Sequence, residues 1–166
     1  IGSQAGVTQQ SLGGLAAIAI GNSSGNDRQG QYATAVGNST GYITQGPYTV
    51  AIGNNAQYTS SGSYSIAIGN SAGYTSQGAS SVAIGYNAGL TSQTTQAIAI
   101  GLNAGQTSQG TNTIAVGNNA GLFSQGAGAV AIGNSAGKGT SGTDFQGVNG
   151  IAIGNLAGTI TQGGSA

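Results

Sequence analysis

Charged side chains are almost absent from this chain of 166 residues. It contains two basic and two acidic residues, so its formal net charge is zero. Such a chain has almost no electrostatic field with which to attract a nucleic acid, an anionic lipid surface or a charged substrate. We therefore expect no nucleic-acid partner. A net charge near zero also removes the repulsion that keeps molecules apart, which favours self-association.

Cysteine, histidine and long apolar runs are absent as well. Without cysteine the chain can form no disulfide, and the redox compartment cannot be inferred from the sequence. No apolar run approaches the roughly 18 residues that a membrane-spanning helix needs. We therefore expect no direct insertion into a membrane.

What the sequence has in abundance is glycine, with 34 residues, many of them at a fixed spacing. The word Ile/Val-Ala-Ile/Val-Gly recurs nine times, with Thr34 once in place of the first apolar residue. Its glycines are Gly21, Gly37, Gly53, Gly69, Gly85, Gly101, Gly117, Gly133 and Gly154, and all steps but the last take sixteen residues. A short fixed period is typical of proteins that stack one structural unit on the next.

The repeat predicts an all-β fold, a parallel β-solenoid of ten coils with about 16 residues per coil. Glycine at this density disfavours a helix by about 1 kcal/mol at each position, and Ile-Ala-Ile alternates with the period of a half-buried strand. We expect one repeat domain over residues 1–166, with longer coils at 2–20, around Leu12-Gly13-Gly14, and at 133–153. The length is two residues short of ten whole coils, and neither end resembles a polar cap, so we expect a longer array or end-to-end assembly.

In a parallel solenoid, equivalent residues of successive coils form columns about 4.8 Å apart. Alternation places the β-branched residues of each strand on one side and the central alanine on the other. We expect the β-branched columns inside and the alanine column outside, where small apolar groups would form a flat assembly face. This candidate assembly face consists of Ala19, Ala35, Ala51, Ala67, Ala83, Ala99, Ala115, Ala131 and Ala152.

A second strand is expected along the segment A-G-Y/L-T-S-Q, with its alanine and the following Tyr or Leu facing the core. Two tyrosine columns and one threonine column also recur at the coil spacing: Tyr42, Tyr58 and Tyr74; Tyr32, Tyr48 and Tyr64; and Thr59, Thr75, Thr91 and Thr107. The tyrosines either fill the edges of the roll as stacked rings or contact a sugar or a neighbouring chain. The threonines favour exposed strand positions, but a regular uncharged column is also compatible with ice binding.

The repeat sequence lacks the residues that catalysis usually requires. The only carboxylates are Asp27 and Asp144, and seven coils would separate them by roughly 34 Å, too far for an acid–base pair. The segment GNSAGKGT at 133–140 resembles a phosphate-binding loop, but Gly139 stands where that loop needs serine or threonine. We expect no catalytic residue, no cofactor and no metal site, and hence no enzyme.

The words Ser81-Val82-Ala83-Ile84-Gly85 and Ser65-Ile66-Ala67-Ile68-Gly69 resemble the repeat of YadA-like trimeric autotransporter adhesin heads. The G-N-x-A-G-x-T-x-Q-G segments are similar to repeats in the fibre proteins of bacteriophages and large viruses. The resemblance covers essentially the whole chain, although the adhesin period is about fourteen residues. It implies a left-handed parallel β-roll, often trimeric, displayed on a cell or virion surface.

Together these observations predict a non-enzymatic structural and adhesive fibre segment at an extracellular, cell-surface or virion-surface location. Its expected partner is itself, as a homo-oligomer or filament, with a surface glycan or protein receptor as a further possibility. The alternative from a different class is an ice-binding β-solenoid.

Overall fold

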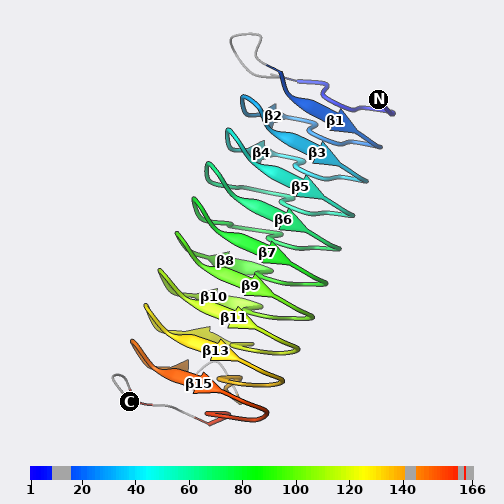
Figure 1. Cartoon of the computed structure of the whole chain (residues 1–166). Helices are drawn as coiled ribbons and strands as arrows, with labels where there is room; N and C mark the ends of the chain where they lie inside the picture. Colours follow the sequence, from blue (N-terminus) through cyan, green and yellow to red (C-terminus); the bar gives the residue numbers. More distant parts are fainter. Residues whose placement is uncertain (9–15, 141–144, 161–162, 164–166) are drawn as a thin grey trace.

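The computed structural model describes residues 1–8, 16–140, 145–160 and 163. The first strands are β1 Ile18–Ile20, β2 Arg28–Gln29, β3 Thr34–Val36, β4 Thr44–Gln45, β5 Val50–Ile52, β6 Ile66–Ile68, β7 Val82–Ile84 and β8 Thr91–Gln93. The remaining strands are β9 Ile98–Ile100, β10 Thr107–Gln109, β11 Ile114–Val116, β12 Ser124–Gln125, β13 Val130–Ile132, β14 Phe145–Gln146 and β15 Ile151–Ile153. Figure 1 shows them as a stack of coils, and no helix occurs in the described part of the chain. The predicted all-β parallel β-solenoid is therefore confirmed.

The front of the solenoid is a nine-stranded parallel sheet in the order β1-β3-β5-β6-β7-β9-β11-β13-β15. Each strand from β1 to β11 pairs with the strand sixteen residues further on, as Val82 does with Ile98. The step from Val130 to Ile151 is longer. The described residues thus form about seven regular turns, and the expected count of ten coils was too high. The Leu12-Gly13-Gly14 stretch of the first coil lies outside the described residues.

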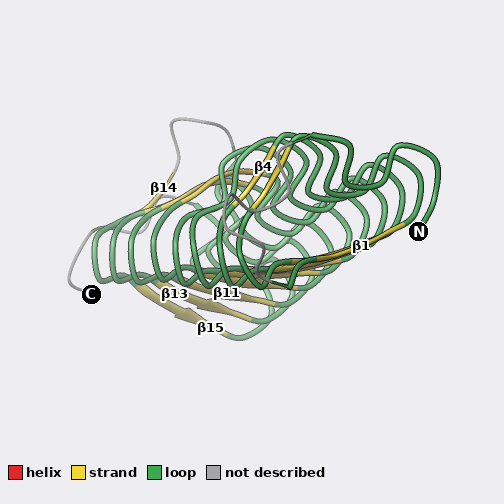
Figure 2. Ribbon diagram, turned by 90° about the horizontal axis from the view of Figure 1, so that it is seen from above, coloured by secondary structure: helices red, strands yellow, loops and turns green. Residues whose placement is uncertain are grey.

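The back of the solenoid is a less regular sheet. It contains the four strands β14-β12-β10-β8 and the pair β2-β4. Between these two groups of strands, the back layer has only isolated parallel bridges. They join Thr44 to Ser60, Ser61 to Gln77 and Gln77 to Gln93. Viewed from above, front strands such as β1 and β15 lie along one side of the coils, and the back strands β4 and β14 lie along the other (Figure 2).

The core between the two layers is made of alanine. From Ala35 to Ala131 the central alanine of every front strand is fully buried, and Ala152 is 2% exposed. A second column of fully buried alanines faces it from the back, as expected: Ala56, Ala72, Ala88, Ala104, Ala120 and Ala136. The thin space between the layers therefore holds methyl groups and excludes larger apolar side chains.

The alanine column is consequently not an assembly face, and the expected orientation of the front strands was wrong. Ala19, Ala35, Ala51, Ala67, Ala83, Ala99, Ala115, Ala131 and Ala152 point into the roll, and their β-branched neighbours point outward. Alternation along a strand shows only that the two sets face opposite sides. The narrow interlayer space decides which set is inside, because an interior packed to native density leaves no room for isoleucine there.

Glutamine is the other main component of the interior. Gln29, Gln45, Gln77, Gln93, Gln109, Gln125 and Gln146 are at least 97% buried. Each donates a hydrogen bond from Nε2 to the carbonyl oxygen of the first residue of a front strand, over 2.7–3.1 Å. This glutamine ladder ties the back layer to the front layer. The tyrosine or leucine of A-G-Y/L, expected in the core, is mostly only half-buried, as Tyr74 is.

In one coil the ladder glutamine is replaced by a serine, and a glutamine at another position occupies the space. In the neighbouring coils glycine stands four residues before the buried glutamine, as Gly73 does before Gln77. A Cβ at Gly73 would lie 2.6 Å from Gln77 Oε1, so the absent side chain makes room for the amide. At 57 and 61 the chain instead has Gln57 and Ser61, both buried.

The side chain of Gln57 makes a different set of hydrogen bonds in this space. Its Nε2 donates to Ser65 Oγ over 2.9 Å and to Gln77 Oε1 over 2.7 Å. Gln45 donates to Gln57 Oε1 over 3.4 Å. A side-chain amide therefore fills the interior of this coil as well, but it comes from residue 57 and not from residue 61. The back sheet is interrupted in the same part of the stack.

Candidate interaction surfaces

The most prominent surface is the outer face of the front sheet, which we name the β-branched face. Its first column is Ile18, Thr34, Val50, Ile66, Val82, Ile98, Ile114, Val130 and Ile151, and its second is Ile20, Val36, Ile52, Ile68, Ile84, Ile100, Val116, Ile132 and Ile153. These side chains are half-buried or exposed, and Ile68 and Ile100 are both 37% exposed. The strand spacing makes the face about 40 Å long and 10 Å wide. An uninterrupted apolar patch of several hundred Å² marks an interaction site.

Two ladders border the β-branched face. Tyr32, Tyr48 and Tyr64, the tyrosine edge ladder, stand two residues before strands β3, β5 and β6. Their rings are stacked with centroids 5.1 Å apart, and they are 45–61% exposed. The asparagine edge ladder, Asn22, Asn38, Asn54 and Asn70, stands two residues after strands β1, β3, β5 and β6. Successive amides are connected by hydrogen bonds of 3.3–3.5 Å.

The other tyrosine column lies in the back layer. Tyr42, Tyr58 and Tyr74 stack with centroids 4.9 Å apart and planes 6° apart. All three are half-buried. Each ring covers the face of the next, so the column presents ring edges to solvent. Both tyrosine columns therefore exist as stacked rings, and their contact with a ligand stays a prediction.

The threonine column uses its hydroxyl groups within the protein. Thr59, Thr75, Thr91 and Thr107 are half-buried. Each Oγ1 donates to a main-chain carbonyl oxygen of the next coil, over 3.2–3.4 Å. These bonds reinforce the stacking of coils. They also leave the hydroxyl hydrogens less available to order water.

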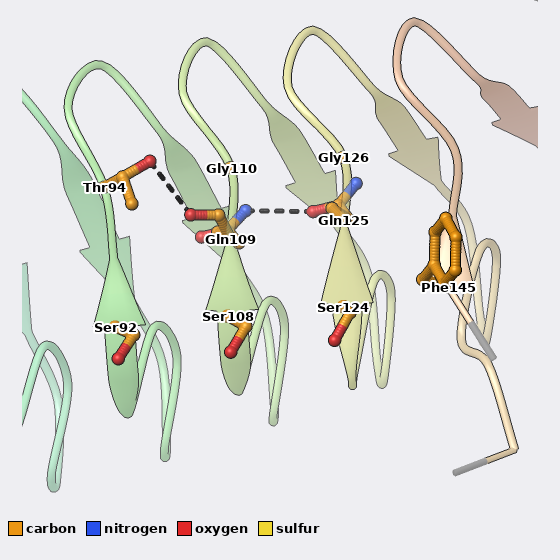
Figure 3. A pocket seen from close by; sticks show the side chains of 9 residues that line it. All are labelled: Ser92, Thr94, Ser108, Gln109, Gly110, Ser124, Gln125, Gly126 and Phe145. Atoms are coloured by element: carbon orange, nitrogen blue, oxygen red, sulfur yellow. Dashed lines mark hydrogen bonds between the residues drawn. The ribbon is translucent and has the colours of Figure 1, made fainter. Parts of the chain in front are cut away.

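The back layer also contains an open groove of about 400 Å³ (Figure 3). A column of serines lines one side: Ser92, Ser108 and Ser124. Thr94 closes one end, where its hydroxyl donates to the carbonyl of Gln109 over 2.9 Å, and the ring of Phe145 stands at the other end. Phe145 is 48% exposed and pairs in register with Ser124. The groove is uncharged, and nothing in its lining is suited to acid–base chemistry.

Charge contributes little to any of these surfaces. Arg28 and Asp27 form an exposed ion pair, with Nε and Oδ2 3.3 Å apart, and such pairs contribute at most about 1 kcal/mol. Asp144, the second carboxylate, lies outside the described residues. Within the described part of the chain, no cluster of three or more histidine, cysteine or acidic side chains is placed to hold a metal ion. The same residues include no helix with the length and hydrophobicity needed to span a bilayer.

Comparison with protein families finds a match for two of the coils. Two segments, residues 75–89 and 107–120, match the model of the YadA head domain repeat. Each segment begins at a back-layer threonine and includes a front strand, β7 or β11; the first ends at Gly89 and the second at Ala120. These two coils resemble YadA head repeats. YadA-type head repeats are structural parts of adhesins, and no curated protein and no solved structure matches this chain.

Sequence reasoning identified the columns of repeated residues but not their roles. Residue size alone could not show that the β-branched residues lie outside, because the thinness of the roll, which excludes isoleucine from its interior, appears only in the folded structure. The buried glutamines repeat as regularly as the alanines, but a polar residue at a fixed spacing is also typical of an exposed position. The sequence alone could not distinguish these alternatives.

Proposed function

We propose that this chain is a non-enzymatic structural segment of an adhesive surface fibre that self-assembles through the β-branched face. The observation that carries the proposal is the nine-stranded sheet whose outer side is apolar at every position except Thr34. The proposed partner is a second copy of the chain, with a surface glycan or protein receptor as the target of adhesion. The proposed location is extracellular, on a cell or virion.

The energetics favour burial of this face. Covering the exposed part of one of its isoleucines contributes roughly 1–2 kcal/mol. The contributions recur along the whole stack, because each coil presents the same residues. YadA-like heads are trimeric, and a trimer closed around three such faces would remove them from water. The absence of charged residues from the face means that no unpaired charge would be buried on assembly.

The first test replaces two isoleucines of the face by glutamate. Ile68→Glu with Ile100→Glu is expected to disperse the assembly, because each copy would bury uncompensated carboxylates in an apolar contact. Sedimentation should then give particles with the mass of a single chain, 15.7 kDa. The circular dichroism of the variant should match that of the parent, since both side chains point away from the core.

The matched control places the same charges in the back layer. Ser76→Glu with Ser124→Glu adds two carboxylates at solvent-accessible serines and is expected to leave the assembly intact. The proposal would be refuted by dispersal of the control alone, or by a parent chain that sediments as a monomer at high concentration.

Ice binding remains the alternative function, and the threonine hydrogen bonds favour the fibre proposal over it. The threonine hydroxyls donate to carbonyl oxygens, so their hydrogens are less available to a water lattice. We expect the purified chain to show no thermal hysteresis at high concentration. A clear hysteresis that disappears in the variant Thr75→Ala with Thr91→Ala would support ice binding instead.

A further inference from the structure

We propose that the tyrosine edge ladder of one copy packs against the asparagine edge ladder of the next copy, and that this contact determines the direction and register of the assembly. The inference rests on the proposed self-association through the β-branched face. It goes further by naming the residues at the edges and the relative position of the copies.

The two ladders border the same strands from opposite edges. Tyr48 stands two residues before β5 and Asn54 stands two residues after it. The strand between them has three residues, so the face is only about 10 Å wide. When three narrow faces close around one axis, each copy meets its neighbours along both edges, and the two edges in contact are different ones. Each tyrosine edge then faces an asparagine edge.

The ladders match in spacing and in hydrogen-bonding groups. Tyrosine centroids repeat every 5.1 Å, and the asparagines repeat once per coil, so the two rows stay aligned over several coils. An amide carries two N–H donors, and a bond within the ladder uses one of them. The tyrosine hydroxyls have no hydrogen-bond partner among the residues that the structure describes. A free N–H can therefore meet a free hydroxyl oxygen.

The backbone at the tyrosine edge supports a role beyond local stability. Tyr32, Tyr48 and Tyr64 have φ of 55°, 57° and 60°, in the left-handed region. Bulky residues are uncommon there, and glycine and asparagine are favoured. Equivalent corners of later coils have the same positive φ with smaller or more flexible residues, Ser80, Gln96, Asn112, Gly128 and Asn149. The tyrosines thus occupy a conformation that disfavours them, and strain of this kind is common at functional sites.

The tyrosines also give the edge a direction. They occupy three successive coils near the beginning of the stack, and Ser80, Gln96 and Asn112 follow at the same position. The asparagine edge ladder spans the same coils and is interrupted by Tyr86 and Leu102. Parallel copies at equal height align all three tyrosines with asparagines, and a ring that closes around one axis keeps its copies at equal height. A shift by one to four coils toward the end of the stack would place at least one ring against Tyr86 or Leu102.

The absence of native cysteine permits a direct test by disulfide cross-linking. In the variant Tyr48→Cys with Asn54→Cys, oxidation of the assembled protein is expected to join neighbouring copies. Within one chain the two positions are separated by roughly 20 Å of extended backbone, well beyond the reach of a disulfide. Cross-linked species of two and three chains should therefore appear on a non-reducing gel.

The control variant moves one cysteine along the same edge column, Tyr48→Cys with Asn118→Cys, four coils away. It is expected to cross-link at least about tenfold less. Equal cross-linking of both variants, or none in a particle that still sediments as an oligomer, would overturn the edge contact while leaving self-assembly in place. A parent chain that is monomeric would overturn both proposals.

A second measurement removes only the hydroxyl groups. Tyr32→Phe with Tyr48→Phe and Tyr64→Phe keeps the stacked rings and is expected to raise the dissociation constant of the assembly at least about tenfold. The matched change in the back layer, Tyr42→Phe with Tyr58→Phe and Tyr74→Phe, should leave it unchanged. Equal effects of the two triple variants would contradict the proposal.

Discussion

Replacing Ser61 by glutamine is expected to destabilise the fold by about 1–3 kcal/mol, even though glutamine is the residue that the neighbouring coils have at this position. In this coil the interior already contains the amide of Gln57, which contacts Ser65 and Gln77. A second amide cannot enter the same space, because even a Cβ at the equivalent Gly73 would lie 2.6 Å from the amide oxygen of Gln77. Urea denaturation of the variant measures the loss.

The converse single change is also expected to be unfavourable. Gln57→Gly removes the hydrogen bonds of Gln57 from a buried site, at about 1–3 kcal/mol for the groups left unpaired. Residue 57 has a φ of 47°, which glycine adopts without steric strain, and this offsets part of the cost.

The double variant Gln57→Gly with Ser61→Gln recreates the regular coil and is expected to recover stability to within about 1 kcal/mol of the parent. A double-mutant cycle should give a coupling energy of about 2 kcal/mol. Simple additivity of the two single changes would show that the two positions do not share one space.

Replacing Ala67 by glutamate is expected to unfold the protein or to destabilise it by several kcal/mol. Ala67 is fully buried between the layers, where a carboxylate would have neither solvent nor a cationic partner. The buried alanines lie in one continuous cluster from Ala51 to Ala152, so damage at Ala67 reaches the coils on both sides. Thermal unfolding followed by circular dichroism is the measurement.

The neighbouring residue provides the control. Ile68→Glu changes the next position of the same strand, but that side chain is on the outer side. It should reduce assembly and leave the melting temperature of the individual chain nearly unchanged. If Ala67→Glu folded normally and dispersed the assembly, the alanine column would be an outer face after all.

The sequence by itself determined the stack, and the tertiary structure decided which side of each strand is its interior. The sixteen-residue period, the parallel register and the columns of identical residues follow from repetition alone, because each coil must pair with a copy of itself. Ala67 and Ile68 could not be assigned to the inside or the outside from their alternation, which is symmetric with respect to the two faces of a strand.

The distance between the layers removed that ambiguity. Glycine corners and a layer of methyl groups bring the front and back of the roll so close that isoleucine is excluded, and its apolar surface is left outside for another molecule to cover. The paired exchange at Gln57 and Ser61 is a consequence of the same close packing. Each substitution disrupts the repeat when considered alone, and only their shared space in the folded coil shows that the two changes compensate each other.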